Sequence, residues 1–173
     1  MIDTALLVLR IVVGVYLAAH GAQKLFGWFG GPGLKGTEGF LGGMLGFRPA
    51  RLWAPALAVA ETGGGVLLAL GLLTPLGAIA VGSSMLTATL VVHWAKGPWG
   101  TEGGYEQTLT NLAVAVAIGV AGAGRYSLDA LFGISVPVWF SVLVAALALL
   151  GVLVAIATRA APVQQSRAEA QAS

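Results

Sequence analysis

The sequence predicts an all-α membrane protein, a polytopic helical bundle with a four-helix core and a fifth, C-terminal transmembrane helix. Hydrophobic residues make up 57% of the 173-residue chain. Only 9% of the residues are charged, against about 25% in an ordinary soluble domain. The apolar stretches also recur at lengths close to the ~20 residues that cross a bilayer as a helix.

The first expected span covers residues 4–26, and its polar residues gather on one side. At about 100° per residue, one helical face collects small and charged side chains. The residues on this face are Arg10, Gly14, Leu17, Gly21 and Lys24, and His20 lies at its edge. We therefore expect this face to pack into the bundle.

Residues 27–52 follow as a glycine-rich cytoplasmic loop. Within it, residues 37–45 have the pattern of a short helix at the membrane interface. A G-x-G-x-x-G at residues 31–36 lacks the preceding strand that a dinucleotide site needs, so it does not predict nucleotide binding.

The second and third spans come from one apolar run that is broken only at Leu73-Thr74-Pro75. The break divides the run into residues 53–73 and 75–94. Proline suits the first turn of a helix, because its missing N–H would have no intrahelical partner there. The connection is short enough to require a tight antiparallel hairpin.

The fourth span is expected at residues 105–121 and the fifth at residues 136–157. Ser141 is the only polar residue of the fifth, so we expect that helix to be a lipid-facing addition without groups for chemistry. The predicted division is a core over residues 1–132, an additional helix over 133–158 and a disordered tail over 159–173.

The basic residues outside the spans lie almost all on one side of the predicted bundle. That side holds Lys24, Lys35, Arg48, Arg51, Lys96, Arg159 and Arg167, whereas the other holds Arg125. The positive-inside rule then places the C-terminus in the cytoplasm and the N-terminus outside, in a multi-pass protein of the plasma membrane.

Glu61 is the only ionisable residue between Pro55 and Val92. A carboxylate inside the bilayer costs at least a few kcal/mol unless it faces protein or water, so it needs partners. Counting rise per residue from the cytoplasmic boundary, His20 lies about 9 Å deep and Glu61 about 12 Å deep. The glycines after Glu61 permit another helix to approach closely. Arg10 lies nearer the outer side and reaches Glu61 only through an extended side chain or a water.

These positions give a set of candidate site residues. The candidates for catalysis are Glu61, His20 and Arg10, and the candidates for ligand binding are Lys24, His93, Glu106 and Asn111. The absence of cysteine excludes thiolate metal sites within the chain, and two histidines do not predict a metal centre. Each residue also has a structural explanation: His93 as an interfacial side chain, and Glu106 as a favourable charge at a helix start.

Two interpretations of the buried charges stay open. In the first, Glu61 pairs with a basic residue only to hold helices in register. In the second, the ionisable groups line a polar cavity that binds a ligand head group or relays protons. The number of groups favours the cavity, because buried ion pairs stabilise proteins poorly compared with apolar packing.

Three short motifs resemble the DoxX family of small bacterial membrane proteins. They are Leu9-Arg10 with residues 20–25 (HGAQKL), residues 61–64 (ETGG) leading into 70–75 (LGLLTP), and residues 124–129 (GRYSLD). The resemblance covers residues 4–131 and implies a four-helix bundle in the plasma membrane, linked in some relatives to oxidative or thiol stress and in a related branch to thiosulfate:quinone oxidoreduction. The fifth span departs from this pattern.

The resemblance and the cavity together give the leading functional hypothesis, a membrane subunit of a redox or oxidative-stress-linked complex that binds a quinone. Whether the chain is itself an enzyme stays open; as an oxidoreductase subunit it would take electrons from soluble redox enzymes at its cytoplasmic face. The alternatives are a non-catalytic scaffold for soluble partners and, ranked last, a small transporter, because no inverted repeat is evident. Nucleic acid is not an expected partner, and the oligomeric state is left open.

Overall fold

The computed structural model describes residues 1–160 and, within them, contains helices, turns and no strand. The elements in chain order are α1 (Ile2–Phe26), η1 (Trp28–Gly30), α2 (Gly33–Gly39), η2 (Phe40–Met44), α3 (Ala50–Leu70), α4 (Thr74–Ala88), η3 (Thr89–His93), η4 (Trp94–Lys96), η5 (Gly100–Glu102), α5 (Glu106–Ala121), α6 (Leu128–Phe132) and α7 (Val138–Ala157). The all-α membrane bundle predicted from the sequence is confirmed. The predicted disordered tail falls mainly on residues 161–173, which lie outside the described part.

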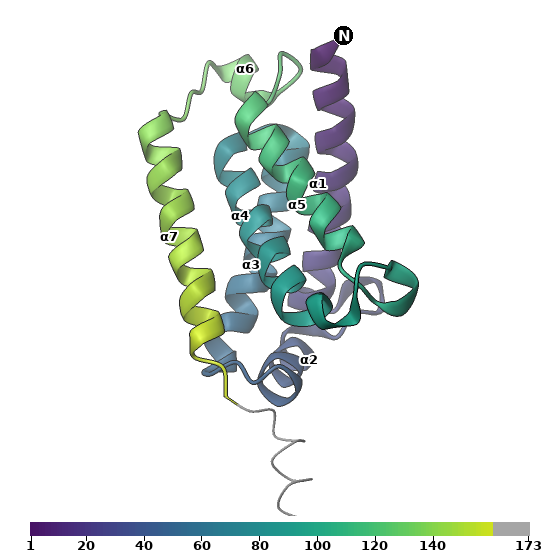
Figure 1. Cartoon of the computed structure of the whole chain (residues 1–173). Coiled ribbons are helices and arrows are strands. Elements are labelled where there is room, and N and C mark those ends of the chain that lie inside the picture. The colour runs from purple at the N-terminus through teal and green to yellow at the C-terminus, as the bar shows by residue number, and fades with distance from the viewer. Residues whose placement is uncertain (161–173) are drawn as a thin grey trace, which may run out of the picture.

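Within residues 1–160, four helices are long and apolar enough to cross a membrane. They are α1, α3, the stretch Thr74–Lys96 and α7. The fourth expected span corresponds to α5, a shorter apolar helix of 16 residues. At ~1.5 Å per residue it extends about 24 Å, less than the ~30 Å of a bilayer's hydrocarbon. It nevertheless lies alongside its neighbours and extends between the two ends of the bundle (Figure 1).

Small residues allow α1 and α3 to pack with their backbones almost in contact. A Cβ at Gly14 of α1 would lie 2.5 Å from the Ala69 nitrogen of α3, and Gly65 makes the reciprocal approach to Ala18. Gly64, on another face of α3, lies against Gly77 of α4. The glycines after Glu61 were expected to admit another helix: Gly65 admits α1, Gly64 admits α4, and Gly63 faces open space.

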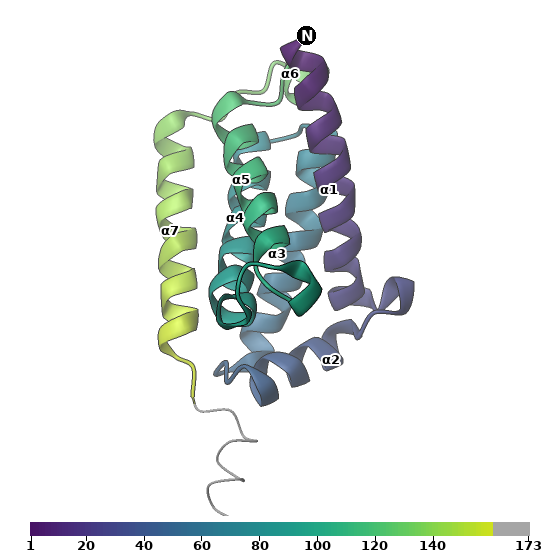
Figure 2. The same ribbon diagram turned by 45° about the vertical axis from the view of Figure 1, so that its right-hand side comes forward.

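The remaining helices surround α4. Helix α5 packs along one side of α4, and α7 packs along another (Figures 1 and 2). Most of α7 is exposed, as expected of a lipid-facing helix, but Val152 and Ala155 near its C-terminal end are buried. Just after the C-terminal end of α7, the Arg159 side chain donates to the Leu45 carbonyl (2.7 Å) and lies over the Phe47 ring.

Helix α2 lies across one end of the bundle, beneath α1 and α3 (Figure 2). The expected interfacial helix exists but begins at Gly33 rather than Thr37, and it continues as a π-type turn to Met44. The Thr37 hydroxyl contacts the Lys24 carbonyl (3.1 Å) and the Gly33 carbonyl (2.9 Å). This contact holds the glycine-rich helix against the end of α1.

The two ends of the bundle match the two sides inferred from charge. The N-terminus and α6 lie at one end, and α2 and the C-terminal end of α7 lie at the other (Figure 1). Which end faces the cytoplasm stays a prediction.

Candidate functional site

The Glu61 carboxylate is fully buried between α1, α3 and α4 and has three side-chain partners. Lys24 Nζ lies 2.6 Å from Oε1 and 2.7 Å from Oε2. Ser84 Oγ donates to Oε1 at 2.6 Å, and His20 Nδ1 lies 3.1 Å from Oε2. A carboxylate buried in the bilayer region is thus compensated by one ammonium, one hydroxyl and one imidazole, as the cost of burying it requires.

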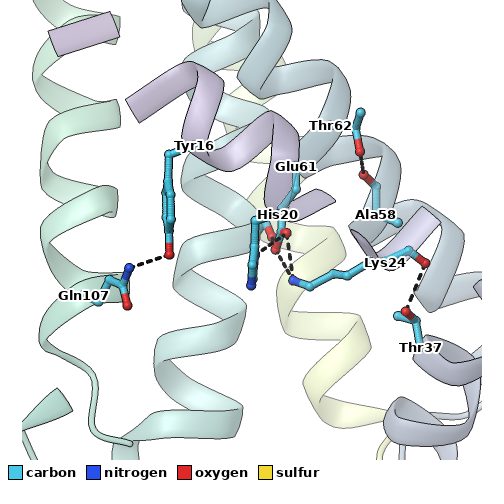
Figure 3. Close-up of polar contacts among 9 residues, drawn as sticks. Tyr16, His20, Lys24, Thr37, Ala58, Glu61, Thr62 and Gln107 are labelled. Carbon is cyan, nitrogen blue, oxygen red and sulfur yellow. Dashed lines mark hydrogen bonds and ion pairs between the residues drawn. The ribbon is translucent and has the colours of Figure 1, made fainter. Parts of the chain in front are cut away.

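The sequence places these groups together through helical spacing and small residues. His20 and Lys24 are i,i+4 neighbours on α1, so both face Glu61 on α3. Gly21 lies between them, and a side chain there would collide with the Thr62 backbone. Thr62 turns its own hydroxyl back to the Ala58 carbonyl (2.7 Å), which leaves Glu61 as the polar group on this face (Figure 3).

The contact between His20 and Glu61 agrees with the depths estimated from the sequence. Lys24, on the face of α1 that was expected to pack into the bundle, also contacts Glu61. Its flexible four-carbon stem carries the ammonium toward the bundle interior, where 20% of the side chain is exposed (Figure 3).

His20 has a second ring nitrogen that is free for a ligand. An ionised carboxylate only accepts hydrogen bonds, so Nδ1 donates to Glu61. Nε2 then accepts in the neutral imidazole and donates in the imidazolium. Within residues 1–160 no protein group bonds Nε2, and 42% of the His20 side chain is exposed. The Tyr16 ring stacks beside His20, and Gln107 of α5 donates to the Tyr16 hydroxyl at 2.5 Å (Figure 3).

A cavity of about 660 Å³ opens beside this cluster. Its polar lining includes Tyr16, His20, Lys24, Glu61, Ser83, Ser84, His93, Gln107, Thr108 and Asn111. The rest is mostly apolar and comes from the loop after α1 and from α3, α4 and α7, with Phe40, Trp53 and Val152 among its members. The volume falls within the ~300–1,000 Å³ of small-molecule sites, and a mostly apolar wall with a few convergent polar groups is typical of them.

The other binding candidates divide into two groups. His93 and Asn111 line the same cavity, although His93 Nδ1 also contacts the Gly103 carbonyl at 2.6 Å. Glu106 does not line it. It is the first residue of α5 and is exposed, with its carboxylate beside Gly100. This placement fits the structural explanation of Glu106 as a helix-start residue.

Arg10 does not reach Glu61. It is 1% exposed and lies at the opposite end of the bundle, where it donates to the carbonyls of Ala69 (2.8 Å), Ala123 (3.2 Å) and Tyr126. Ala69 lies in the last turn of α3, where carbonyls lack intrahelical partners. The guanidinium of Arg10 carries five N–H donors, and Arg10 therefore acts as a structural clamp between α1, the end of α3 and the loop after α5.

Nearby, Asp129 closes the same end of the bundle. Its carboxylate accepts from the backbone nitrogens of Leu73 (2.7 Å) and Thr74 (3.0 Å) and from the Thr74 hydroxyl (2.7 Å). It therefore serves as a cap for the start of α4 from a distant part of the chain.

Sequence reasoning missed Ser84, Tyr16 and Gln107. Ser84 was missed because hydroxyls in membrane helices usually bond their own backbone, as Ser83 and Thr87 do here. Tyr16 lies one turn before His20, so its i,i+4 spacing was an available signal. No group of three or more potential metal ligands is present in residues 1–160.

The fold and this cluster define a class of protein: a helical membrane protein with a charge-compensated polar site at the side of an intramembrane cavity. The family model named DoxX matches residues 5–94, which are 90 of the 173 residues, and the chain belongs to the DoxX family. The matched region contains the Glu61 cluster, whereas residues 124–129, which also carried the resemblance, lie beyond it. No curated protein and no solved structure matches the chain.

Proposed function

We propose that this chain is the membrane subunit of a redox or oxidative-stress-linked complex and that the cavity beside Glu61 binds a quinone or a similar lipid-soluble ligand. The observation that carries the proposal is the free Nε2 of His20 in a mostly apolar cavity of about 660 Å³. A quinone offers an apolar body with carbonyl oxygens, and it supplies two-electron, two-proton redox chemistry when bound.

Each residue of the Glu61 cluster has a separate role in ligand binding. His20 presents Nε2 to a ligand oxygen, either as an acceptor or, when cationic, as a donor. Glu61 orients the imidazole through Nδ1 and stabilises its positive charge, in the way that a buried carboxylate supports a catalytic histidine elsewhere. Lys24 and Ser84 hold the carboxylate in place. His93 in η3 and Asn111 on α5 also line the cavity, and they are available to bind the other end of a head group.

The electrons come from a partner in this proposal, because the chain contains no cysteine and no residue set typical of a redox centre. Soluble redox enzymes at the end that carries α2 are the proposed source. Exposed aromatic residues at this end, including Trp28, Phe29 and Trp99, are available for contact with such a partner.

Direct binding tests the proposal. Purified full-length protein is titrated with a tail-less benzoquinone, and binding is followed by fluorescence, because Trp53 lines the cavity. We expect saturable quenching, which Glu61→Gln weakens at least about tenfold while the protein stays folded. The matched control is Glu102→Gln, which removes an exposed carboxylate outside the cavity and should bind as wild type does. No saturable binding by the wild-type protein rejects the proposal, and unchanged binding by Glu61→Gln assigns Glu61 to the register clamp alone.

A further inference from the structure

A second cavity of about 560 Å³ lies between α4, α5 and α7. Its walls are the facing sides of three helices and are almost entirely apolar. Its two hydroxyls, Ser83 and Ser141, both donate to carbonyls of their own helices, at 2.9 Å and 3.3 Å. It therefore offers no hydrogen bond to a head group and suits a hydrocarbon chain.

The two cavities adjoin. Ser83 of α4 and Ala148 and Val152 of α7 line both of them. The lining residues of α7 also form one continuous stripe at helical spacing through both cavities. The stripe comprises Val138, Ser141, Val142, Ala145, Ala148, Leu149, Gly151, Val152 and Ala155.

The length of the second cavity matches a lipid-like chain. From Val138 to Val152 the stripe spans 14 residue-to-residue steps, about 21 Å at ~1.5 Å per residue. This is most of the ~30 Å hydrocarbon thickness of a bilayer. Small residues keep the space open, since a Cβ at Gly82 would meet only Leu112 Cδ1, at 3.6 Å. Figures 1 and 2 show α7 standing apart from α5 along this length.

We infer that the ligand is a long-tailed amphiphile, with its head beside the Glu61 cluster and its apolar tail in the groove between α4, α5 and α7. This inference rests on the proposed function and deepens it, because it specifies the tail as part of what is recognised. The tail passes Ser83 and Ala148 where the cavities meet. Helix α7 thus contributes to ligand selection although it carries no ionisable group.

The test compares two probes with the same head: a benzoquinone without a tail and the same benzoquinone with a long saturated tail. Affinities are expressed per mole fraction in the bilayer, so that simple partitioning does not count as binding. The wild-type protein should bind the tailed probe more tightly. Ala145→Phe should weaken the tailed probe about tenfold and leave the tail-less probe unchanged, because Ala145 lines the second cavity and not the first. The matched control is Ala146→Phe, an exposed α7 position outside both cavities, which should bind both probes as wild type does.

A second measurement on the wild-type protein does not depend on the variant's folding. A tailed probe with a photoreactive group at the tail end should label residues between Val138 and Leu149 and be displaced by excess unlabelled probe. Equal affinity for both probes, or labelling that excess probe does not displace, overturns the tail site and assigns the groove to ordinary bilayer lipid. In that case the head-group proposal stands. If neither probe binds, the proposed function and this inference both fail.

Discussion

At the scale of single residues, polar groups in this bundle perform two separate tasks at its two ends. Arg10 and Asp129 direct their hydrogen bonds to backbone and hydroxyl groups that helix ends and turns leave unpaired. His20 and Glu61 instead bond other side chains beside a cavity. The first pair of residues stabilises the fold, whereas the second has capacity left for a ligand.

Arg10→Ala should destabilise the protein without changing the site. Three carbonyls, one at the end of α3 and two in the loop after α5, lose their donor, which we expect to lower the free energy of unfolding by about 2–4 kcal/mol. Denaturant titration in detergent measures the loss, and Arg125→Ala, at an exposed side chain of the same end, is the control. Quinone affinity in the folded fraction should stay at the wild-type value. A variant as stable as wild type would contradict the clamp.

Ser84→Ala should cost about 1 kcal/mol of stability, because Glu61 Oε1 loses a hydrogen bond in a fully buried position. Ser83→Ala, the preceding residue, is a matched control because its hydroxyl only bonds the Ala80 carbonyl of its own helix. Thermal unfolding of the two variants side by side measures the difference. Equal stability of both variants would show that the hydroxyl does not support the carboxylate.

At the scale of elements, glycine spacing sets which helices touch and therefore where Glu61 finds its partners. Gly14 and Gly21 on α1 face Gly65 and Thr62 on α3 at close range, one turn or so from the cluster. This contact fixes the distance across which His20 and Lys24 reach Glu61.

Gly65→Ala should therefore reduce both stability and ligand affinity. The added methyl group meets the Ala18 backbone and Gly14 carbonyl, so α1 and α3 must separate, at a cost of about 1–3 kcal/mol. Gly63→Ala is the control on the same helix, where a Cβ meets nothing within 4 Å. It should be neutral or stabilise by up to about 1 kcal/mol. Thermal unfolding and quinone titration of the pair check both effects, and a stable, fully binding Gly65→Ala protein would disprove the packing.

At the scale of the whole molecule, the ends of the bundle separate the basic residues, and this separation predicts the topology. A C-terminal fluorescent fusion should be bright in the cytoplasm, with an enzymatic reporter that works only outside the membrane inactive at the same site. A dark cytoplasmic fusion together with an active external reporter would reverse the orientation.

Much of the architecture followed from the sequence, because membrane spans are set by length and hydropathy. The hairpin at Leu73-Thr74-Pro75 and the end of the first helix at Phe26 were located within a few residues. The start of α2 was predicted at residue 37 instead of Gly33, because glycine lowers helix propensity. The early turns are held by a tertiary contact from Thr37, which the local sequence does not reveal.

The candidate site was predicted in part for equally physical reasons. Depth along two helices was sufficient to pair His20 with Glu61. It could not locate the ends of long side chains, so it left open which basic residue pairs with Glu61 and did not predict the carbonyls that Arg10 binds. The Arg10 guanidinium lies against the left-handed turn at Gly71, and hydrophobic periodicity does not predict such a turn.

The central claim is that the Glu61 cluster serves a ligand-binding cavity, and native mass spectrometry of the protein purified in mild detergent tests it most directly. We predict a lipid-soluble molecule with a quinone head and a long apolar tail, retained in a stoichiometric amount by the wild-type protein and lost from folded Glu61→Gln. Wild-type protein that retains no such molecule, yet still captures soluble partners, would contradict the account and favour a scaffold whose buried charges only hold its helices together.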